Sequence, residues 1–243
     1  MPDVCLVVPC YNEAARLNGA AFLDYLARDP RVNLCFVDDG STDGTTAMLA
    51  ALAAKHPERI QALTLAQNSG KAEAVRQGMR HVVDGGAFTY AGYWDADLST
   101  PLAELRAMVD VLDANPACVM ALGSRWKRLG SRISRDPWRH VLGRVFATVA
   151  SLTLRLPVYD SQCGAKVIRT AKAGALFAEP FITRWLFDVE ILARLQRQTA
   201  GDAPLAIEVP LAEWRDVAGS RLGWLQMAAA PIGLWKIRQR YRS

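Results

Sequence analysis

The sequence predicts an α/β protein with a mostly parallel central sheet flanked by helices, and three observations support this class. Short apolar runs alternate with longer helical stretches up to about residue 125. The connections between them are short and rich in Gly, Asp, Asn and Ser. Several of the runs are continuously apolar, which is typical of parallel strands covered on both faces. Repeated strand–helix units form right-handed crossovers, so the strands are expected in one sheet.

Five segments are predicted as strands because each is a short apolar or alternating run ended by turn-forming residues. They are Val4–Val8, Asn33–Val37, Ile60–Leu65, Tyr90–Trp94 and Cys118–Gly123. The predicted helices are Ala14–Ala27, Thr46–Lys55, Lys71 to about Val83, and Leu102–Ala114. In this assignment Pro9 ends the first strand.

Length and composition limit the class of protein. The chain has 243 residues, 51% of them apolar, which suits one large domain or two small ones. The net charge of +5 favours an anionic partner, such as nucleotide phosphates, a lipid surface or nucleic acid. The five cysteines lack CxxC spacing, which predicts reduced core residues in a cytosolic protein. We expect neither a signal peptide nor a membrane-spanning segment.

Asp95 and Asp97 follow the predicted strand Tyr90–Trp94 and are separated by one small residue. The carboxyl ends of strands in an open α/β sheet form the edge where ligands bind. Two carboxylates at that edge can share a hard divalent cation through their oxygens. The alternative is that Asp97 or Ser99 only caps the following helix. This segment by itself leaves both roles open.

Polar residues also follow three other predicted strands, and we expect them at the same edge of the sheet. After the first strand, Tyr11 offers a flat face to a base, and Glu13 can accept hydrogen bonds from base or ribose. Asp39 lies in the turn DDGSTDGT and suits the same groups. Lys71 follows a glycine turn at a helix start, which favours an anion. Helix capping is the alternative for the first two clusters, and neither GxGxxG nor GxxxxGK[ST] occurs.

Together these motifs carry a resemblance to a known family. VVPCYNE, VDDGSTDGT, NSGKAEAVRQGM and DADLSTP, in this order and spacing, resemble the inverting family 2 glycosyltransferases of the GT-A fold. Later motifs resemble the dolichyl-phosphate glucosyltransferase branch, close to the dolichyl-phosphate mannosyltransferases. These motifs are GSR at 123–125, DSQCGAKVIR at 160–169, RWLFDVEILARL at 184–195 and EVPLAEW at 208–214. The resemblance covers about residues 3–225 and implies a GT-A nucleotide-diphospho-sugar transferase fold.

The resemblance also implies a role for individual residues. The nucleotide would be bound by Pro9, Tyr11, Glu13, Asp39, Lys71 and Asp95. Asp95 and Asp97 would hold Mg²⁺ or Mn²⁺ on the donor diphosphate, and Asp97 and Arg125 would be catalytic. Arg125, with Arg135 or Arg139, would bind the acceptor phosphate. Apart from the resemblance, Asp160, near Gln162, is expected to line the acceptor side or to serve a purely structural role.

The chemistry of a phosphate acceptor is consistent with that assignment. Such an acceptor is already an anion near pH 7, so it needs a cationic cradle more than a general base. A bound metal would stabilise the leaving diphosphate as a Lewis acid. Basic residues are dense after the fifth predicted strand: Arg125, Lys127, Arg128, Arg132, Arg135 and Arg139. A solvated basic loop is the alternative explanation for this cluster.

Two segments are candidates for membrane contact. Residues 140–156 are apolar with isolated arginines, and residues 222–241 are rich in Trp and Met before a basic end. Both suit helices that lie in a membrane interface, and packing against the sheet or a second subunit is the alternative. Between these segments, Asp188 and Glu190 are expected to anchor a helix against a loop or to serve a purely structural role.

The sequence predicts one catalytic domain over residues 1–220, with a nucleotide half to about 125 and an acceptor half after it. Residues 221–243 are predicted to form an amphipathic helical tail. The expected reaction moves a hexose, glucose from UDP-glucose, onto a polyprenyl or dolichyl phosphate. The alternatives are GDP-mannose or a UDP-N-acetylhexosamine as donor, a soluble acceptor, or a nucleotide-sugar-binding module without turnover. We expect a cytoplasmic protein, peripheral on the cytosolic face of a membrane, without a nucleic-acid partner.

Overall fold

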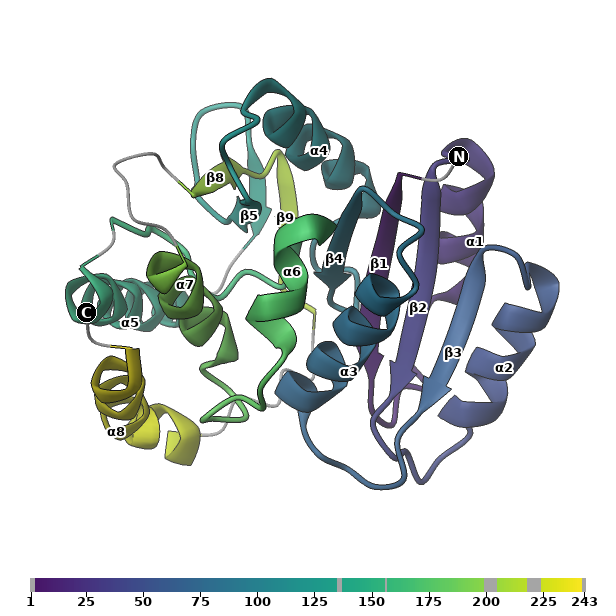
Figure 1. The fold of residues 1–243 in the computed structure, drawn as a ribbon, viewed down its shortest axis with the longest axis horizontal. Coiled ribbons are helices and arrows are strands. Elements are labelled where there is room, and N and C mark those ends of the chain that lie inside the picture. Colours follow the sequence, from purple (N-terminus) through teal and green to yellow (C-terminus); the bar gives the residue numbers. More distant parts are fainter. Residues whose placement is uncertain (1–2, 135–136, 156, 199–204, 218–223, 242–243) are drawn as a thin grey trace. The chain divides into compact units, whose positions relative to one another are not determined.

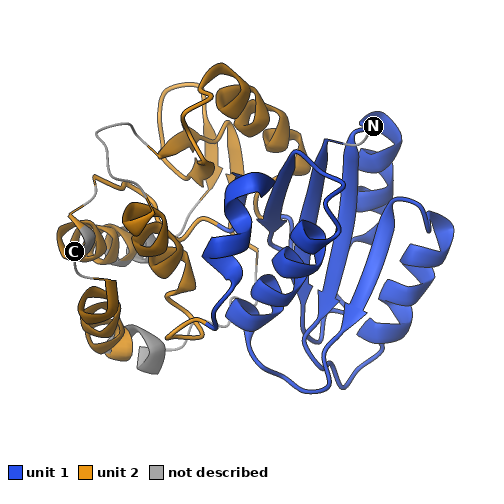
Figure 2. Cartoon of the chain, viewed as in Figure 1, with its two compact units in different colours: residues 1–98, 164–180 blue, residues 99–163, 181–243 orange. Residues whose placement is uncertain are grey.

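The structure is a computed structural model, and it divides into two compact units (Figure 2). Unit 1 comprises residues 1–98 and 164–180, and unit 2 comprises residues 99–163 and 181–243. The described residues are 3–134, 137–155, 157–198, 205–217 and 224–241.

Unit 1 contains strands in the order β3-β2-β1-β4-β7 (Figure 1). They are β1 Val4–Cys10, β2 Val32–Asp38, β3 Ile60–Thr64, β4 Tyr90–Trp94 and β7 Ala165–Arg169. β1 to β4 pair with one another in parallel, whereas β7 runs antiparallel to β4. The predicted mostly parallel sheet is confirmed, and β7 is a strand that the sequence analysis did not anticipate.

Helices accompany this sheet, and all of them except α6 were predicted. In unit 1 they are α1 Gly19–Arg28, α2 Thr45–Lys55, α3 Lys71–Asp84 and α6 Thr170–Phe177. α3 packs across β1 and β2 and against α6 (Figure 1). Gly78 permits this close approach, because a Cβ there would overlap Val7 and lie 2.7 Å from Cγ2 of Val37.

The inner strands β1, β2 and β4 are apolar because both faces of the sheet are covered there, whereas the edge strand β3 has exposed residues. All seven residues of β2 are buried. Phe36 in this strand meets Phe22 of α1 edge to face, with ring centroids 5.2 Å apart. The five cysteines are buried thiols that form no disulfide, which confirms their predicted place in the core. Burial raises the pKa of the Cys35 thiol to about 12, so it stays protonated at neutral pH.

The prediction that Pro9 ends the first strand is wrong, because β1 continues to Cys10. Successive residues of a strand turn their backbone groups to opposite sides of the strand. The Cys10 carbonyl accepts the N–H of Asp39, next to β2, so Pro9 faces the other side. On that side β4 pairs only with Val4–Val7, so no ladder bond requires the N–H that proline lacks.

The first predicted helix also begins later than expected, at Gly19 instead of Ala14. Asn18 caps α1, because its side chain accepts the N–H of Ala21 at 3.1 Å. The preceding residues form a turn in which the Glu13 carbonyl accepts the N–H of Leu17. The segment after β1 is therefore a loop, and neither Asn12 nor Glu13 caps the helix.

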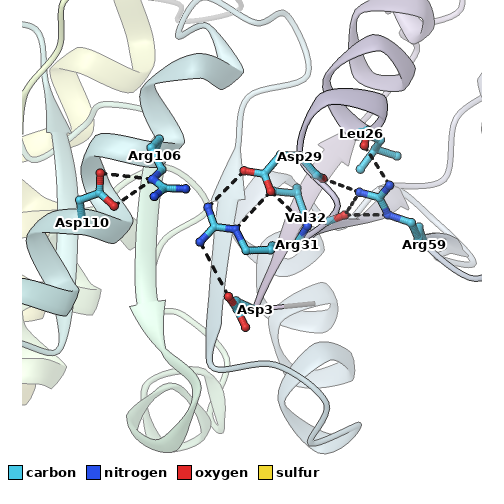
Figure 3. A network of polar contacts seen from close by, with 8 residues as sticks. All are labelled: Asp3, Leu26, Asp29, Arg31, Val32, Arg59, Arg106 and Asp110. Atoms are coloured by element: carbon cyan, nitrogen blue, oxygen red, sulfur yellow. Dashed lines mark hydrogen bonds and ion pairs between the residues drawn. The ribbon is translucent and has the colours of Figure 1, made fainter. Parts of the chain in front are cut away.

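Figure 3 shows how arginines secure the chain around the end of α1. Arg59 donates to the carbonyls of Leu26 at 2.9 Å and of Asp29 and Val32 at 2.6 Å each. Arg31 forms an ion pair with Asp29, with 3.3 Å between Nε and Oδ1. The bonds from Arg59 to Leu26 and Asp29 satisfy carbonyls that the end of α1 leaves without helical partners.

Unit 2 contains two parallel strand pairs and several helices. The strands β5 Met120–Ser124 and β8 Ala206–Pro210 pair with each other, as do β6 Arg132–Ser134 and β9 Glu213–Arg215. The helices are α4 Leu105–Ala114, α5 Pro137–Leu154, α7 Phe187–Arg197 and α8 Trp224–Tyr241, and a 3₁₀ turn, η1, spans Leu102–Glu104. α8 packs against both α5 and α7. No helix in the described ranges is both long and apolar enough to cross a bilayer.

Glu190 ties α7 to the end of α8, in line with the predicted anchoring role. Its fully buried carboxylate accepts from Arg194 at 2.7 Å, from the Tyr241 hydroxyl at 2.8 Å and from the N–H of Ile182 at 2.8 Å. Burial and the hydrogen bond to Glu190 raise the pKa of Tyr241. Asp188 is also buried, in the first turn of α7.

Candidate functional site

The loops that follow β1 and β2 are joined by hydrogen bonds. The N–H of Asn12 donates to Oγ of Ser41 at 2.9 Å, and Oδ1 of Asn12 accepts the N–H of Thr42 at 2.8 Å. The N–H of Glu13 donates to Oγ1 of Thr45 at 2.8 Å. Asn12 has a φ of +51°, a left-handed conformation that asparagine tolerates better than most residues. The first two predicted clusters therefore lie together at one edge of the sheet.

Asp39 connects this pair of loops to the third. Its carboxylate accepts the N–H of Ser69 at 2.7 Å and the N–H of Gly70 at 2.8 Å. The residue is 2% exposed. Gly40 next to it has a φ of +65°, and a Cβ there would lie 2.5 Å from the carbonyl carbon of Gln67. The glycine thus allows the second and third loops to touch.

Lys71 and Asp95 form an ion pair at the same edge of unit 1. Nζ of Lys71 lies 2.5 Å from Oδ1 of Asp95. Lys71 is the first residue of α3, and Gly70 before it has a φ of +93°. The side chains of Lys71 and Asp95 are 41% and 32% exposed, so solvent and ligands reach the pair. Both residues are predicted for this edge from the sequence, but their ion pair is not.

Gly164 is a residue that sequence reasoning missed. Its carbonyl accepts the N–H of Asp95 at 3.1 Å. A Cβ at position 164 would overlap the carboxylate of Asp95, so only glycine leaves room for that side chain. The available signal was the glycine of the DSQCGAKVIR motif, but its neighbour in space comes from a strand about seventy residues earlier.

Arg16 is a second missed residue. It forms a bidentate pair with Glu13, with Nη2–Oε1 and Nε–Oε2 distances of 2.5 Å and 3.1 Å. The hydrogen bond to Glu13 raises the pKa of Arg16, and the charge of Asp97 adds to that shift. The side chain of Arg16 is 32% exposed. Its only sequence signal was its position three residues after Glu13.

The alternative that Asp97 or Ser99 caps the next helix is not borne out. η1 has Pro101 at its N-cap position and no side-chain cap bond, and α4 likewise has none. Leu98 has a φ of +52°, an uncommon conformation for a bulky residue, and such outliers concentrate at functional sites.

The metal prediction can be tested against the available ligands. No group of three or more His, Cys, Asp or Glu side chains suited to a metal occurs among the described residues. Asp95 and Asp97 would thus supply two carboxylates. Mg²⁺ is often bound in this way, by one or two carboxylates with phosphate oxygens and water completing the shell. The two aspartates fit a metal that arrives with a diphosphate.

The remaining predicted donor-side residues also belong to this edge. Pro9 lies in β1, and Tyr11 is half-buried in the loop after it. The edge thus collects Pro9, Tyr11, Glu13, Asp39, Lys71, Asp95 and Asp97, all within unit 1. Their predicted contacts with a nucleotide and a metal remain predictions.

Unit 2 holds the residues predicted for the acceptor. Asp160 accepts from Nε and Nη2 of Arg125 at 2.6 Å and 2.7 Å, and from the Arg125 N–H at 3.0 Å. Glu208 in turn accepts the N–H of Asp160 at 2.7 Å. Arg125 also stacks over Trp214, with its Cζ 5.3 Å from the ring centroid. With a side chain 15% exposed, Arg125 is fixed in place and is not part of a solvated loop.

The other predicted basic residues differ from Arg125. Lys127 and Arg128 are exposed, and Arg132 is 81% exposed beside Glu213, as the solvated-loop alternative expects. Arg135 lies outside the described residues. Arg139 falls in α5, and its side chain also lies outside the described part.

Two further residues complete the surroundings of Asp160. Gln162 is half-buried. Arg144 of α5, which the sequence analysis did not single out, donates to the carbonyl of Tyr159 at 2.6 Å and stacks 3.6 Å over its ring.

Comparison with known proteins identifies the family. The glycosyl transferase family 2 model matches residues 5–176. The dolichyl-phosphate beta-glucosyltransferase of Homo sapiens is 31% identical, covering 98% of this chain and 78% of its own length. The Saccharomyces cerevisiae protein of the same name is 28% identical, with 89% and 68% covered. The chain therefore belongs to glycosyl transferase family 2, and it is a glycosyltransferase.

Solved structures support the same fold. Glucosyl-3-phosphoglycerate synthase from Mycobacterium tuberculosis, in complex with UDP, has a TM-score of 0.68 at 17% identity, covering 98% of this chain and 80% of that chain. A complex of that enzyme with Mn²⁺, UDP-glucose and phosphoglyceric acid has the same TM-score at 16% identity and the same coverage. The predicted GT-A fold is confirmed by this likeness.

Proposed function

We propose that this protein transfers glucose from UDP-glucose to a polyprenyl or dolichyl phosphate, with inversion and with a divalent metal. The observation that carries the proposal is the edge of unit 1, where loops after successive strands bring Lys71 and Asp95 together, with Asp97 two residues further along the chain. The names of the relatives supply the sugar and the lipid phosphate. The nucleotide in the solved complexes supplies the donor.

On the donor side, we propose that Tyr11, Glu13 and Asp39 contact the nucleoside and that Lys71 contacts the diphosphate. The exposed Lys71–Asp95 pair supports this role, because a diphosphate can take the ammonium as a partner while a metal takes Asp95. Mg²⁺ or Mn²⁺, held by Asp95 and Asp97, would supply Lewis-acid stabilisation of the leaving diphosphate. Pro9 would fix the backbone beneath the base.

On the acceptor side, we propose that Arg125 holds the acceptor phosphate and aims its oxygen at the anomeric carbon. Asp160 binds the Nε–Nη2 edge of the guanidinium, which fixes the plane of the group before a ligand arrives. Arg135 or Arg139 would add a second cation, and Gln162 would line the acceptor site with a polar side chain. The acceptor needs no general base, since a phosphate dianion or monoanion is itself the nucleophile.

The proposal extends to organisation and location. We propose that residues 1–220 act as one catalytic domain, that residues 221–243 form a helical tail, and that the protein works peripherally on the cytosolic face of a membrane. The absence of acidic residues from α5 and α8 supports contact with an anionic surface.

A phosphorylated soluble acceptor is the second candidate, because the solved enzyme with a similar fold was crystallised with phosphoglyceric acid. Both candidates place an anionic phosphate near Arg125 and differ in whether the acceptor carries a lipid.

The test is incubation with radiolabelled UDP-glucose or GDP-mannose, Mg²⁺, and either a polyprenyl phosphate or phosphoglyceric acid. We expect a lipid-extractable product from UDP-glucose and the polyprenyl phosphate. A product from GDP-mannose alone would overturn the donor, a product from phosphoglyceric acid alone would overturn the lipid acceptor, and no product from any mixture would contradict the proposed activity.

A further inference from the structure

Large apolar side chains are exposed on one unit of the molecule only. Within the described residues, every exposed large apolar side chain belongs to unit 2. They are Trp126, Leu129, Val141, Val145, Val149, Leu152, Ile182, Ile232 and Trp235. Single exposed apolar residues are ordinary, but gathered ones indicate a partner.

Four of these residues form a row along α5. Val141, Val145, Val149 and Leu152 recur at the spacing of one helix face, with exposures of 51%, 58%, 43% and 72%. Ala147 and Ala150, elsewhere on the helix, are buried. α5 therefore packs into unit 2 through Ala147, Ala150 and Phe146, whose ring lies 5.4 Å from that of Trp185, and leaves a row of branched apolar side chains uncovered.

α8 repeats this arrangement. Ile232 and Trp235, one turn apart, are 61% and 60% exposed, while Leu234 and Ile237 are buried. Tryptophan is a frequent anchor at membrane–water interfaces, because its ring is apolar and its N–H finds polar partners there.

The charges carried by α5, by α8 and by the loop over residues 125–132 have one sign. Neither α5 nor α8 contains Asp or Glu, and α8 ends with Lys236, Arg238 and Arg240. The loop over residues 125–132 has four basic residues and no acid, and it also exposes Trp126 and Leu129. Segments that expose apolar side chains and carry only basic charges of their own complement a surface that is apolar and anionic.

We propose that the exposed row of α5, together with Ile232 and Trp235 of α8, docks onto an anionic lipid bilayer. A second copy of the chain is a poorer occupant, since a symmetric contact through these helices would set basic residues against basic residues. This docking surface is an addition to the proposed function. It rests on the proposed function only in one respect, namely the reason why the enzyme would meet a bilayer. The docking itself requires neither donor nor acceptor.

The test measures binding to vesicles without polyprenyl phosphate, made of phosphatidylcholine alone or mixed with phosphatidylglycerol. The variant Val145→Glu/Val149→Glu places two carboxylates in the α5 row. Its matched control is Ala50→Glu/Ala54→Glu, which makes the same charge change at the same spacing on exposed positions of α2 in unit 1. We expect the α5 variant to lose about tenfold or more in affinity for the mixed vesicles. The control should bind like wild type.

A second variant distinguishes weaker membrane binding from misfolding of the protein. Val145→Thr/Val149→Thr keeps the side-chain shape and the charge, and it should weaken binding less than the glutamates do. Equal binding by wild type and the α5 glutamate variant would overturn the proposal. The proposal would also be overturned if wild-type protein bound neither kind of vesicle. The same holds if wild type were a dimer that the two glutamate substitutions dissociate.

Activity on a short, water-soluble isoprenyl phosphate separates this proposal from the proposed function. The α5 variants should retain that activity, because their substitutions lie outside the donor and acceptor residues. Vesicle binding without any glucose transfer would refute the proposed function but support the docking surface. Transfer without vesicle binding would support the proposed function but refute the docking surface.

Discussion

Unit 1 and unit 2 present opposite kinds of surface to a ligand. In unit 1, polar side chains at the strand ends are held by hydrogen bonds between loops, as Asp39 is by Ser69 and Gly70. Among its described residues no large apolar side chain is exposed. Unit 2 exposes apolar rows on α5 and α8 and carries basic residues beside them.

This difference indicates a division of labour that fits an enzyme with one water-soluble substrate and one amphiphilic substrate. A nucleotide sugar is polar throughout, and the edge of unit 1 offers hydrogen-bonding and charged groups to it. A lipid phosphate combines an anion with an apolar chain, and unit 2 has a fixed arginine, Arg125, as well as exposed apolar helices. Substitutions in each unit should therefore impair different steps.

The largest effect is expected from Asp97→Ala. Loss of a metal ligand should remove several kcal/mol of transition-state stabilisation, which lowers kcat by about a thousandfold or more. Turnover with saturating UDP-glucose and acceptor measures it. Vesicle binding, which depends on unit 2, should not change, and unaltered turnover would refute the metal role of Asp97.

The next effect is expected from Arg125→Lys. Lysine keeps a cation beside the buried Asp160 but lacks the planar fork, so it cannot bind Asp160 and a phosphate in the same geometry. We expect kcat/KM for the acceptor to fall about tenfold to a hundredfold. The KM for UDP-glucose should stay unchanged. Arg132→Lys, an exposed arginine of the same unit, is the control and should leave both parameters as they are.

A smaller effect, on stability and metal binding, is expected from Gly164→Ala. The added Cβ must displace the Asp95 carboxylate, which should destabilise the fold by about 1–3 kcal/mol and weaken Mn²⁺·UDP binding. In an Asp95→Ala background both penalties should vanish, because the overlapping carboxylate is gone. Gly174→Ala in α6, where a Cβ would lie 3.6 Å from Val83, should be neutral or stabilising. Additive effects in the double variant would contradict the role given to Gly164.

The smallest effect concerns the pH dependence of stability. Arg76 donates to Glu73 and lowers the pKa of that carboxyl. A carboxyl whose pKa is lower in the folded state stabilises the fold above its ordinary pKa of 4.5, and this contribution disappears as pH falls through the folded value. Glu73→Gln should therefore cost about 1 kcal/mol near neutral pH. The cost should shrink below about pH 4.

Urea unfolding at several pH values tests this prediction. Asp110→Asn is the control from unit 2, because its pair with Arg106 is exposed on both sides and should contribute little (Figure 3). A cost for Glu73→Gln that stays constant with pH would show that the ion pair is not its cause.

The sequence predicted the parallel part of the fold and the donor edge well, because both depend on local patterns. Apolar runs defined β1 to β4, and the polar clusters after them had to meet once the strands were parallel. What remained hidden depends on contacts between distant segments. β7 is antiparallel and gave no strand–helix repeat, and Gly164 acquires its importance only beside Asp95. Whether β1 can continue through Pro9 depends on where its pairing with β4 ends.

The acceptor side was less predictable for a different reason. Arg125 was one of six arginines and lysines in a short stretch, and only its place in the GSR motif at 123–125 distinguished it from Arg132. The distinction comes from Asp160 and Trp214, which lie far along the chain and bury one arginine while the other stays exposed.

Calorimetric titration of UDP with Mn²⁺ into wild type, Asp97→Ala and Arg125→Lys tests the division of labour most directly. The account predicts that wild type binds UDP in a Mn²⁺-dependent manner, that Asp97→Ala loses the metal-dependent part, and that Arg125→Lys binds like wild type. Equal loss in both variants, or wild-type binding by Asp97→Ala, would contradict it.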